Sequence, residues 1–224
     1  MNPPPRGAFH DRADAGRALA GPIVALALAD PVVLALPRGG VPVGVEVARA
    51  LKAPLDVLLV RKIGAPWQRE LAVAAVVEGE QPEVVIDEET LAASGATRDY
   101  VDREAEHEWA EIARRRQTYR GGRPPLAVAG RDVVLVDDGI ATGTTVRAAL
   151  KGLRRLKPRR LVLAVPVAPP EAVATLQGEV DDLVCLSQPV FFHAVGAHYV
   201  DFRQVEDDEV VEMLREHPPG KAAP

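Results

Sequence analysis

Two adjacent carboxylates, Asp137 and Asp138, follow a run of four apolar residues at positions 133–136. Shortly after them comes a loop of small residues, Ala141-Thr142-Gly143-Thr144-Thr145, which leads at once into a helical pattern. Such a loop can turn successive backbone N–H groups inward, and the helix N-terminus adds partial positive charge, so an anion of phosphate size should fit there. Carboxylates beside a phosphate cradle would serve vicinal sugar hydroxyls or a divalent cation.

The same residues fit other patterns less well. A strand followed by an Asp-Gly turn and a capped helix would account for part of the segment. A nucleotide P-loop is poorly supported because no lysine follows Gly143, and a dinucleotide-binding loop is poorly supported because Gly139 and Gly143 lack its spacing.

A second candidate loop, Arg38-Gly39-Gly40, follows the apolar run 32–36. Adjacent glycines permit backbone geometry that other residues avoid, and they let a ligand approach the main chain closely. Arg38 offers a bidentate contact to a phosphate. A tight strand-to-helix turn is the plainer alternative.

A third candidate is the cation pair Arg61-Lys62, at the end of the apolar run 55–60. Two cations at the carboxyl end of a strand could meet a polyanionic ligand. The alternative is an ordinary solvated charge pair.

These loops require a framework of alternating strands and helices. The expected helices cover residues 11–29 (with a break at Gly21-Pro22), 43–51, 97–119, 144–156 and 170–176. The expected strands cover residues 32–36, 55–60, 71–77, 83–86, 133–136, 161–165 and 183–186. Residues 62–70 are expected as a polar loop, and 71–77 with 83–86 as a hairpin. Strands separated by helices predict a parallel, doubly wound α/β sheet, in which ligands bind beyond the carboxyl ends of the strands.

Bulk composition fits a single globular domain: 224 residues, 47% of them hydrophobic, with scarce aromatics and hence an aliphatic core. The net charge of −5 gives no support to broad binding of nucleic acids or anionic membranes. The single cysteine, Cys185, excludes an intrachain disulfide, and we expect it to be a buried, inert thiol. The apolar run 23–29 is too short to span a bilayer and no targeting segment is apparent, so we expect a cytoplasmic protein.

Residues 133–145 closely resemble the signature with which type I phosphoribosyltransferases bind PRPP (5-phosphoribosyl-1-pyrophosphate), and the resemblance covers most of residues 10–205. It implies a Rossmann-like, mainly parallel sheet with a small hood. It also implies that Asp137 and Asp138 hold the ribose hydroxyls, while Ala141, Thr142, Gly143, Thr144 and Thr145 hold the 5′-phosphate. Arg38, Gly39 and Gly40 match the family's pyrophosphate loop, and Arg61 and Lys62 would meet the pyrophosphate as further catalytic groups.

The same resemblance organises the rest of the chain. A phosphoribosyltransferase-like domain over residues 10–217 would lie between flexible segments 1–9 and 218–224. The helical insertion 97–119 would cover the site or form the contact of a homodimer. Residues 189–205 would form the hood over the acceptor, and the loop 62–70 a mobile lid that excludes water.

The implied reaction transfers the 5-phosphoribosyl group of PRPP to a nitrogenous, base-like acceptor with release of pyrophosphate. Mg²⁺ is expected to arrive with PRPP, with Asp137 or Asp138 nearby and no direct protein ligand assigned. Family members that act on 6-oxopurines typically carry an aspartate where this chain has Ala141. That difference argues against hypoxanthine or guanine and leaves the acceptor open.

Two other functions stay open. A non-catalytic, PRPP-binding regulatory protein could use an RNA surface, and the candidate is the arginine cluster 114–116 with Arg120 and Arg123. Because that cluster alternates with acidic residues, a solvated helix face is the simpler interpretation, and nucleic acid is not an expected partner. The third function is a sugar-phosphate enzyme of another kind, such as a hydrolase or a PRPP-synthesising enzyme.

Overall fold

The computed structural model describes residues 8–78 and 83–217. Most of the two segments expected to be flexible, residues 1–7 and 218–224, therefore lies outside the described residues. Phe9, also assigned to the first of them, forms a bridge with Tyr199. Its N–H donates to the carbonyl of His198 at 2.9 Å, which ties the start of the described chain to the C-terminal segment.

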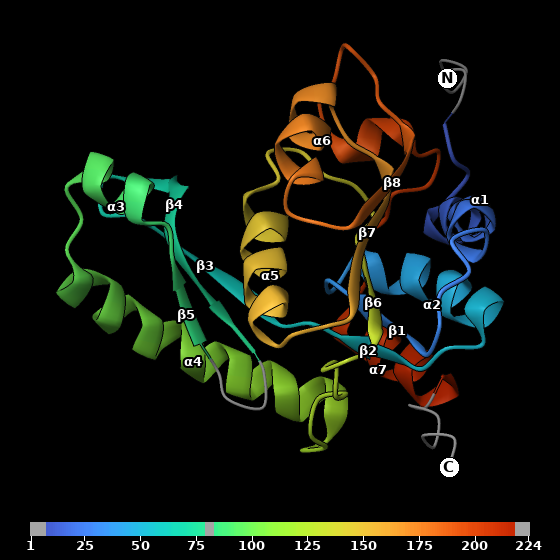
Figure 1. Ribbon diagram of the computed structural model, residues 1–224, viewed down its shortest axis with the longest axis horizontal. Helices are drawn as coiled ribbons and strands as arrows, with labels where there is room; N and C mark the ends of the chain where they lie inside the picture. The colour runs from blue at the N-terminus through green and yellow to red at the C-terminus, as the bar shows by residue number, and fades with distance from the viewer. Residues whose placement is uncertain (1–7, 79–82, 218–224) are drawn as a thin grey trace.

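Within the described residues, five parallel strands form the central sheet (Figure 1). Their order is β2 (Leu55–Val57), β1 (Pro31–Ala35), β6 (Asp132–Val136), β7 (Arg160–Val167) and β8 (Asp182–Ser187). The apolar runs of β1, β6 and β7 are almost wholly buried, as in parallel sheets covered on both faces. The predicted parallel α/β sheet is confirmed. Cys185 lies on β8 and is partly buried rather than fully buried.

Helices cover both faces of this sheet. On one face, α1 (Arg12–Val24), α2 (Gly40–Leu51) and α7 (Asp207–Glu216) pack against alternate strand residues such as Val33 and Val134. On the other face, α5 (Thr144–Arg155) and α6 (Pro170–Gln177) pack against the intervening residues, such as Leu34 and Leu135. Successive strand residues point to opposite faces, so each strand contributes to both layers.

Helix α1 does not break at Gly21-Pro22, contrary to the sequence-based expectation. It runs without interruption to Val24. Pro22 removes one helical hydrogen bond, but it lies on the exposed side of α1. Leu19 and Ile23, one turn apart, are fully buried, and their packing holds the helix together across the proline.

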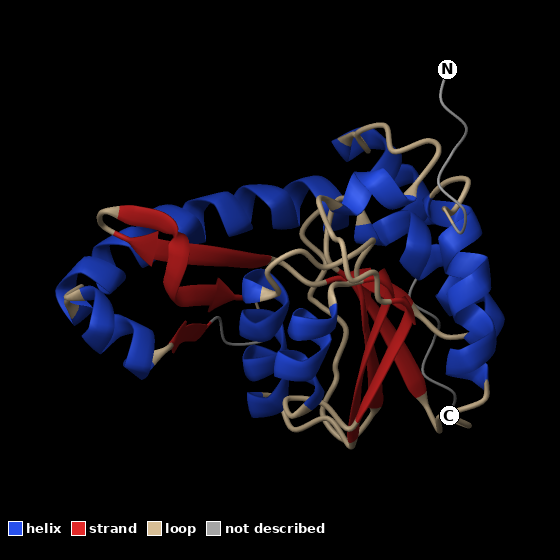
Figure 2. Ribbon diagram, turned by 90° about the horizontal axis from the view of Figure 1, so that it is seen from above, coloured by secondary structure: helices blue, strands red, loops and turns tan. Residues whose placement is uncertain are grey.

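A second, antiparallel sheet consists of β3 (Val60–Ala65), β4 (Gln68–Val77) and β5 (Glu83–Ile86). Together with α3 (Glu88–Ser94) and α4 (Arg98–Arg120), it forms an arm on one side of the central sheet (Figures 1 and 2). The pairing of β4 with β5 confirms the expected hairpin. The polar loop expected over 62–70 is wrong, because most of it forms the hairpin of β3 and β4.

Contacts with α3 and α4 stabilise the hairpin of β3 and β4. Gly64 lies at an irregularity in the strand pairing, where a Cβ atom would come within 2.2 Å of the carbonyl oxygen of Arg69. The Tyr100 hydroxyl donates to the carbonyl of Gly64 at 2.9 Å. The indole N–H of Trp67, at the hairpin tip, donates to the carbonyl of Ser94 at 2.9 Å. The tip of the hairpin lies at the far end of the arm (Figure 1). A lid function for residues 62–70 stays a prediction.

Helix α4 confirms the helix expected over 97–119. Its N-cap is Thr97, whose side chain accepts from the backbone N–H of Tyr100 at 3.2 Å. None of the helices in the described part of the chain is long and apolar enough to cross a membrane.

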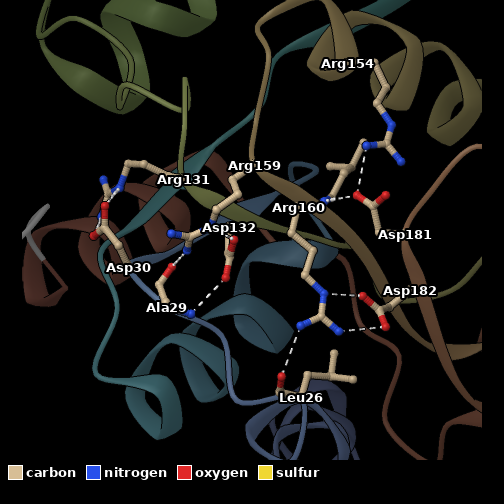
Figure 3. Close-up of polar contacts among 11 residues, drawn as sticks. Leu26, Ala29, Asp30, Arg131, Asp132, Arg154, Arg159, Arg160, Asp181 and Asp182 are labelled. Carbon is tan, nitrogen blue, oxygen red and sulfur yellow. Dashed lines mark hydrogen bonds and ion pairs between the residues drawn. The ribbon is translucent and has the colours of Figure 1, made fainter.

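The amino ends of the central strands are joined by ion pairs between arginines and aspartates (Figure 3). Arg131 bonds Asp30, at the start of β1, and Arg160 bonds Asp182, at the start of β8. Arg159 and Asp132 form a third pair across β6 and β7 at 2.8 Å. This network closes the amino edge of the sheet, so the opposite, carboxyl edge is where a ligand site can form.

Candidate functional site

The acidic pair and the small-residue loop meet at the carboxyl end of β6. They outline a hollow of about 190 Å³, whose described lining consists of Asp137 and residues 139–146. Gly143, with φ of +77°, turns the chain into α5, which begins at Thr144. The first turn of a helix presents free backbone N–H groups and partial positive charge to such a hollow. The structure therefore brings the predicted loop residues and Asp137 together around this hollow.

The two aspartates occupy different environments. Asp137 contributes to the described lining of the hollow. The carboxylate of Asp138 is directed to α1 and to the loop after β1, where its Oδ2 accepts from Arg12 Nε at 2.7 Å. A further hydrogen bond, from the backbone N–H of Asp138 to Asp137 Oδ1 at 2.9 Å, links the pair.

Burial and proximity shift the acidity of both carboxyls. Burial, together with the negative charge of Asp138, raises the pKa of Asp137 well above its ordinary value. Burial also raises the pKa of Asp138, while the hydrogen bond and positive charge of Arg12 oppose that rise. Two close carboxyls of this kind share their protons as a pair. Hydrogen-bond donors or a cation placed beside them would favour the fully ionised form.

The sequence did not identify Arg12 or Tyr199 as site residues. The Tyr199 hydroxyl donates to the backbone carbonyl of Asp138 at 2.5 Å, and burial raises the pKa of that hydroxyl. Arg12 is one residue after the N-cap of α1 and 126 positions before Asp138. No local pattern marks such a contact, because it depends on how α1 packs against the carboxyl edge of the sheet.

The loop after β1 packs directly on the acidic pair. A Cβ atom on Gly39 would lie 2.0 Å from Asp138 Oδ2, and one on Gly40 would lie 2.8 Å from the carbonyl oxygen of Val136. Gly39 has an ordinary φ of −59°, so close approach rather than special backbone geometry requires glycine here. The peptide bond between Pro37 and Arg38 is cis.

Arg38 reaches the start of α7. Its guanidinium lies 3.3 Å from Glu206 Oε2 and 3.8 Å from Asp207 Oδ1. Asp207 also accepts from the Tyr119 hydroxyl at 2.6 Å, and burial together with this hydrogen bond raises the pKa of Tyr119 to about 12. A polyanion at the β1 loop would therefore compete with two carboxylates for Arg38.

Arg61 and Lys62 do not form one cationic patch. They are neighbours on β3, so their side chains point to opposite faces of that strand. Arg61 lines a cavity of about 40 Å³ together with Pro37 and Thr145, close to both candidate loops, and its Nε donates to Glu108 Oε2 at 2.7 Å. The predicted pair is therefore divided, with Arg61 on the side of the candidate loops.

A larger cavity, of about 240 Å³, lies next to the small-residue loop 141–145, between α5 and the arm. Residues 142–144 form part of its wall. Its cations are engaged by acids: Lys151 and Arg147 lie 3.3 and 3.5 Å from Asp87 Oδ2, and Arg147 also bonds Glu179. Charge in this cavity is thus largely compensated within the protein.

The predicted hood, residues 189–205, packs next to the acidic pair. Val195 lies so close to Gly139 that a Cβ atom there would come within 2.5 Å of its side chain. Phe192 stacks on the ring of His198 at 5.4 Å, whereas Phe191 is 86% exposed. Proximity to the site fits a hood, and contact with an acceptor stays a prediction.

Comparison with known proteins shows similarity to one family along most of the chain. The family model for the phosphoribosyl transferase domain matches residues 7–201. The chain is 45% identical over 206 residues to Rv0571c of Mycobacterium tuberculosis, whose name assigns it to the phosphoribosyl transferases. That match covers 92% of this chain and 46% of the other, so the chain spans less than half the length of this relative.

Two further similarities concern a solved structure and a shorter stretch of sequence. A crystal structure of TT1426 from Thermus thermophilus superposes with a TM-score of 0.86 and 48% identity, covering 94% of this chain and 99% of that one. A uracil phosphoribosyltransferase of Acidovorax sp. is 43% identical over 53 residues, which is 24% of this chain and 25% of that protein.

Proposed function

The chain belongs to the phosphoribosyl transferase domain family, and from this premise we propose that it binds PRPP and transfers the 5-phosphoribosyl group to a nitrogenous acceptor with release of pyrophosphate. The observation that carries the proposal is the junction of β6 with α5. There a carboxylate, a hollow of phosphate size and a helix N-terminus share one edge of the sheet.

In the proposed complex, the N–H groups and hydroxyls of residues 141–145 hold the 5′-phosphate. The ribose hydroxyls donate to the acidic pair, with Asp137 nearest the hollow. Pyrophosphate lies over Gly39 and Gly40, where Arg38 exchanges its carboxylate partners for phosphate oxygens. Arg61 adds positive charge on the same side. These groups would act by positioning and by stabilising the charge of the departing pyrophosphate.

Magnesium fits this arrangement as a partner of the substrate. The described residues contain no cluster of three or more His, Cys, Asp or Glu side chains that would bind a metal by themselves. Mg²⁺ retains several waters and uses one or two carboxylates plus substrate phosphates. Asp137 and Asp138 are the carboxylates in place, and the bound ion would neutralise charge on pyrophosphate. The remaining contacts would come from PRPP.

We propose a base other than a 6-oxopurine as the acceptor, because this chain has Ala141 where such enzymes carry an aspartate. The 53-residue match to a uracil phosphoribosyltransferase makes uracil the first acceptor to test. Because this match is local, other nitrogenous bases must be tested as acceptors as well.

Ion pairing in α4 weakens the regulatory alternative. Arg114 and Arg115 bond Glu111, and Arg116 and Arg120 bond Glu78. The candidate RNA surface is thus largely neutralised by the protein's own acids. A cytoplasmic location and a homodimer stay predictions.

The test is release of pyrophosphate from PRPP with Mg²⁺, in the presence of uracil, cytosine, adenine, hypoxanthine or guanine in turn. We expect acceptor-dependent release that is lost in an Asp137→Asn/Asp138→Asn variant. The matched control is Asp30→Asn, an exposed carboxylate at the opposite edge of the sheet. Release that needs no acceptor would indicate a hydrolase, and release with hypoxanthine alone would refute the acceptor class.

A further inference from the structure

Arg12 connects three parts of the protein around the acidic pair. Its Nε donates to Asp138 Oδ2 at 2.7 Å, and its Nη1 donates to the backbone carbonyl of Arg203 at 2.7 Å. Its guanidinium carbon lies 3.9 Å from the centre of the Phe202 ring. One side chain of α1 thereby joins the end of β6 to the C-terminal hood segment.

This contact differs from the many exposed ion pairs of the protein. The side chains of Arg12 and Asp138 are 11% and 14% exposed. A pair withdrawn from water gains more from charge attraction, and it leaves a costly unpaired charge when one partner is removed. Gly39 bounds Asp138 on a second side, where a Cβ atom would lie 2.0 Å from Oδ2. The carboxylate is therefore held between Arg12 and the backbone of the β1 loop.

The charges that face Asp138 are Arg12 from α1 and Asp137 from its own strand end. Tyr199, from the hood, contacts its backbone carbonyl and carries no charge. Arg12 is thus the group that offsets the repulsion between the two carboxylates. A ribose hydroxyl needs an aligned carboxylate oxygen as its acceptor, so the orientation that Arg12 gives to Asp138 sets how well the sugar can bind.

We propose that Arg12 is a positioning residue of the sugar site: it holds the Asp138 carboxylate in its orientation, and it couples the acidic pair to the hood segment through Arg203 and Phe202. This role rests on the proposed function, because the ligand it serves is the ribose of PRPP. The proposal gives α1, which lies outside the three candidate loops, a role in substrate binding.

The test compares Arg12→Gln and Arg12→Lys with wild type, using calorimetric titration of PRPP at neutral pH and amide hydrogen exchange of the hood segment without ligand. Arg17→Gln is the matched control, since Arg17 lies on the same helix and its side chain is 57% exposed. In Arg12→Gln, we expect faster amide exchange in the hood segment and wild-type exchange in the antiparallel sheet. The PRPP affinity should fall about tenfold, the loss expected for one charge-assisted contact. Arg12→Lys restores the charge and should recover most of that affinity.

The outcomes separate the positioning role from the proposed function. Wild-type protein that binds no PRPP would refute the proposed function. An Arg12→Gln variant with wild-type PRPP affinity and wild-type exchange in the hood segment would refute the role of Arg12 alone. If Arg12→Gln does not unfold cooperatively, Arg12→Lys decides the question. A folded Arg12→Lys variant that recovers both PRPP affinity and hood protection supports the proposal, and one that does not recover both overturns it.

Discussion

Replacement of Gly39 by alanine tests how closely the β1 loop and the acidic pair depend on each other. The new Cβ atom would lie 2.0 Å from Asp138 Oδ2, whereas ordinary van der Waals contact begins near 3.4 Å. The carboxylate must therefore retreat by roughly 1.4 Å, or the loop must shift by a similar amount. The first movement displaces Oδ2 from its 2.7 Å contact with Arg12. The second displaces the β1 loop from the acidic pair.

Two costs follow from that movement. Overpacking should lower the free energy of unfolding by about 1–3 kcal/mol. Loss of a charge-assisted contact, worth about 1.5–3 kcal/mol, should weaken PRPP binding by roughly tenfold to a hundredfold. Gly21→Ala is the control, because no atom lies within 4 Å of its added Cβ and alanine favours a helix interior by about 0.5–1 kcal/mol.

Chemical denaturation and PRPP calorimetry measure the two costs separately. We expect Gly39→Ala to lose affinity while it still unfolds cooperatively, and Gly21→Ala to gain stability with unchanged affinity. A Gly39→Ala protein with wild-type stability and wild-type PRPP affinity would show that the packing described for this loop is wrong.

Three further perturbations have expected outcomes. Arg120→Met leaves the buried carboxylate of Asp56 without this ion-pair partner and removes one of the two arginines that bond Glu78, so chemical denaturation should show a loss of about 3–5 kcal/mol; no loss would contradict the buried network. The pKa of Asp137 is raised in the folded state, so folding favours the protonated form of this carboxyl, and its ionisation opposes folding as pH rises. Asp137→Asn should therefore raise the melting temperature at neutral pH, with the gain disappearing below about pH 3.9, the ordinary value for Asp; a gain that is independent of pH would contradict this cause. Glu206→Gln combined with Asp207→Asn releases Arg38 from its carboxylates and should tighten pyrophosphate binding about threefold in calorimetry; weaker binding would contradict the competition.

The central motif was predictable because it is local. Residues 133–145 carry the buried strand, the acidic pair, the small loop and the helix start in one continuous segment. Each of these features depends on neighbours a few positions away. The same holds for the parallel sheet, whose strands are marked by their own apolar runs.

Features that depend on distant contacts were not predictable in this way. Asp137 and Asp138 are alike in sequence, and only the packing of Arg12, far along the chain, distinguishes them. Arg61 and Lys62 were treated as one cationic patch because the segment was assigned to a loop, yet in a strand their side chains diverge. The hairpin of β3 and β4, with its irregular pairing at Gly64, was missed because residues 62–70 were expected to form a polar loop.

The two short helices α3 and α7 were also missed. Helix α7 begins with a capping box between Glu206 and Glu209, a signal that the sequence contains. That pattern could have predicted the start of a helix near Glu206. The role of this helix as a partner of the β1 loop, however, follows only from tertiary packing.

The most direct test of the central claim is calorimetric titration of PRPP with Mg²⁺ into wild-type protein and the Asp137→Asn/Asp138→Asn variant. Saturable binding to wild type, lost in the double variant and retained in Asp30→Asn, is the predicted result. A double variant that binds PRPP as tightly as wild type would contradict the assignment of the sugar site to the acidic pair. Absence of binding to folded wild-type protein would contradict the proposed function itself.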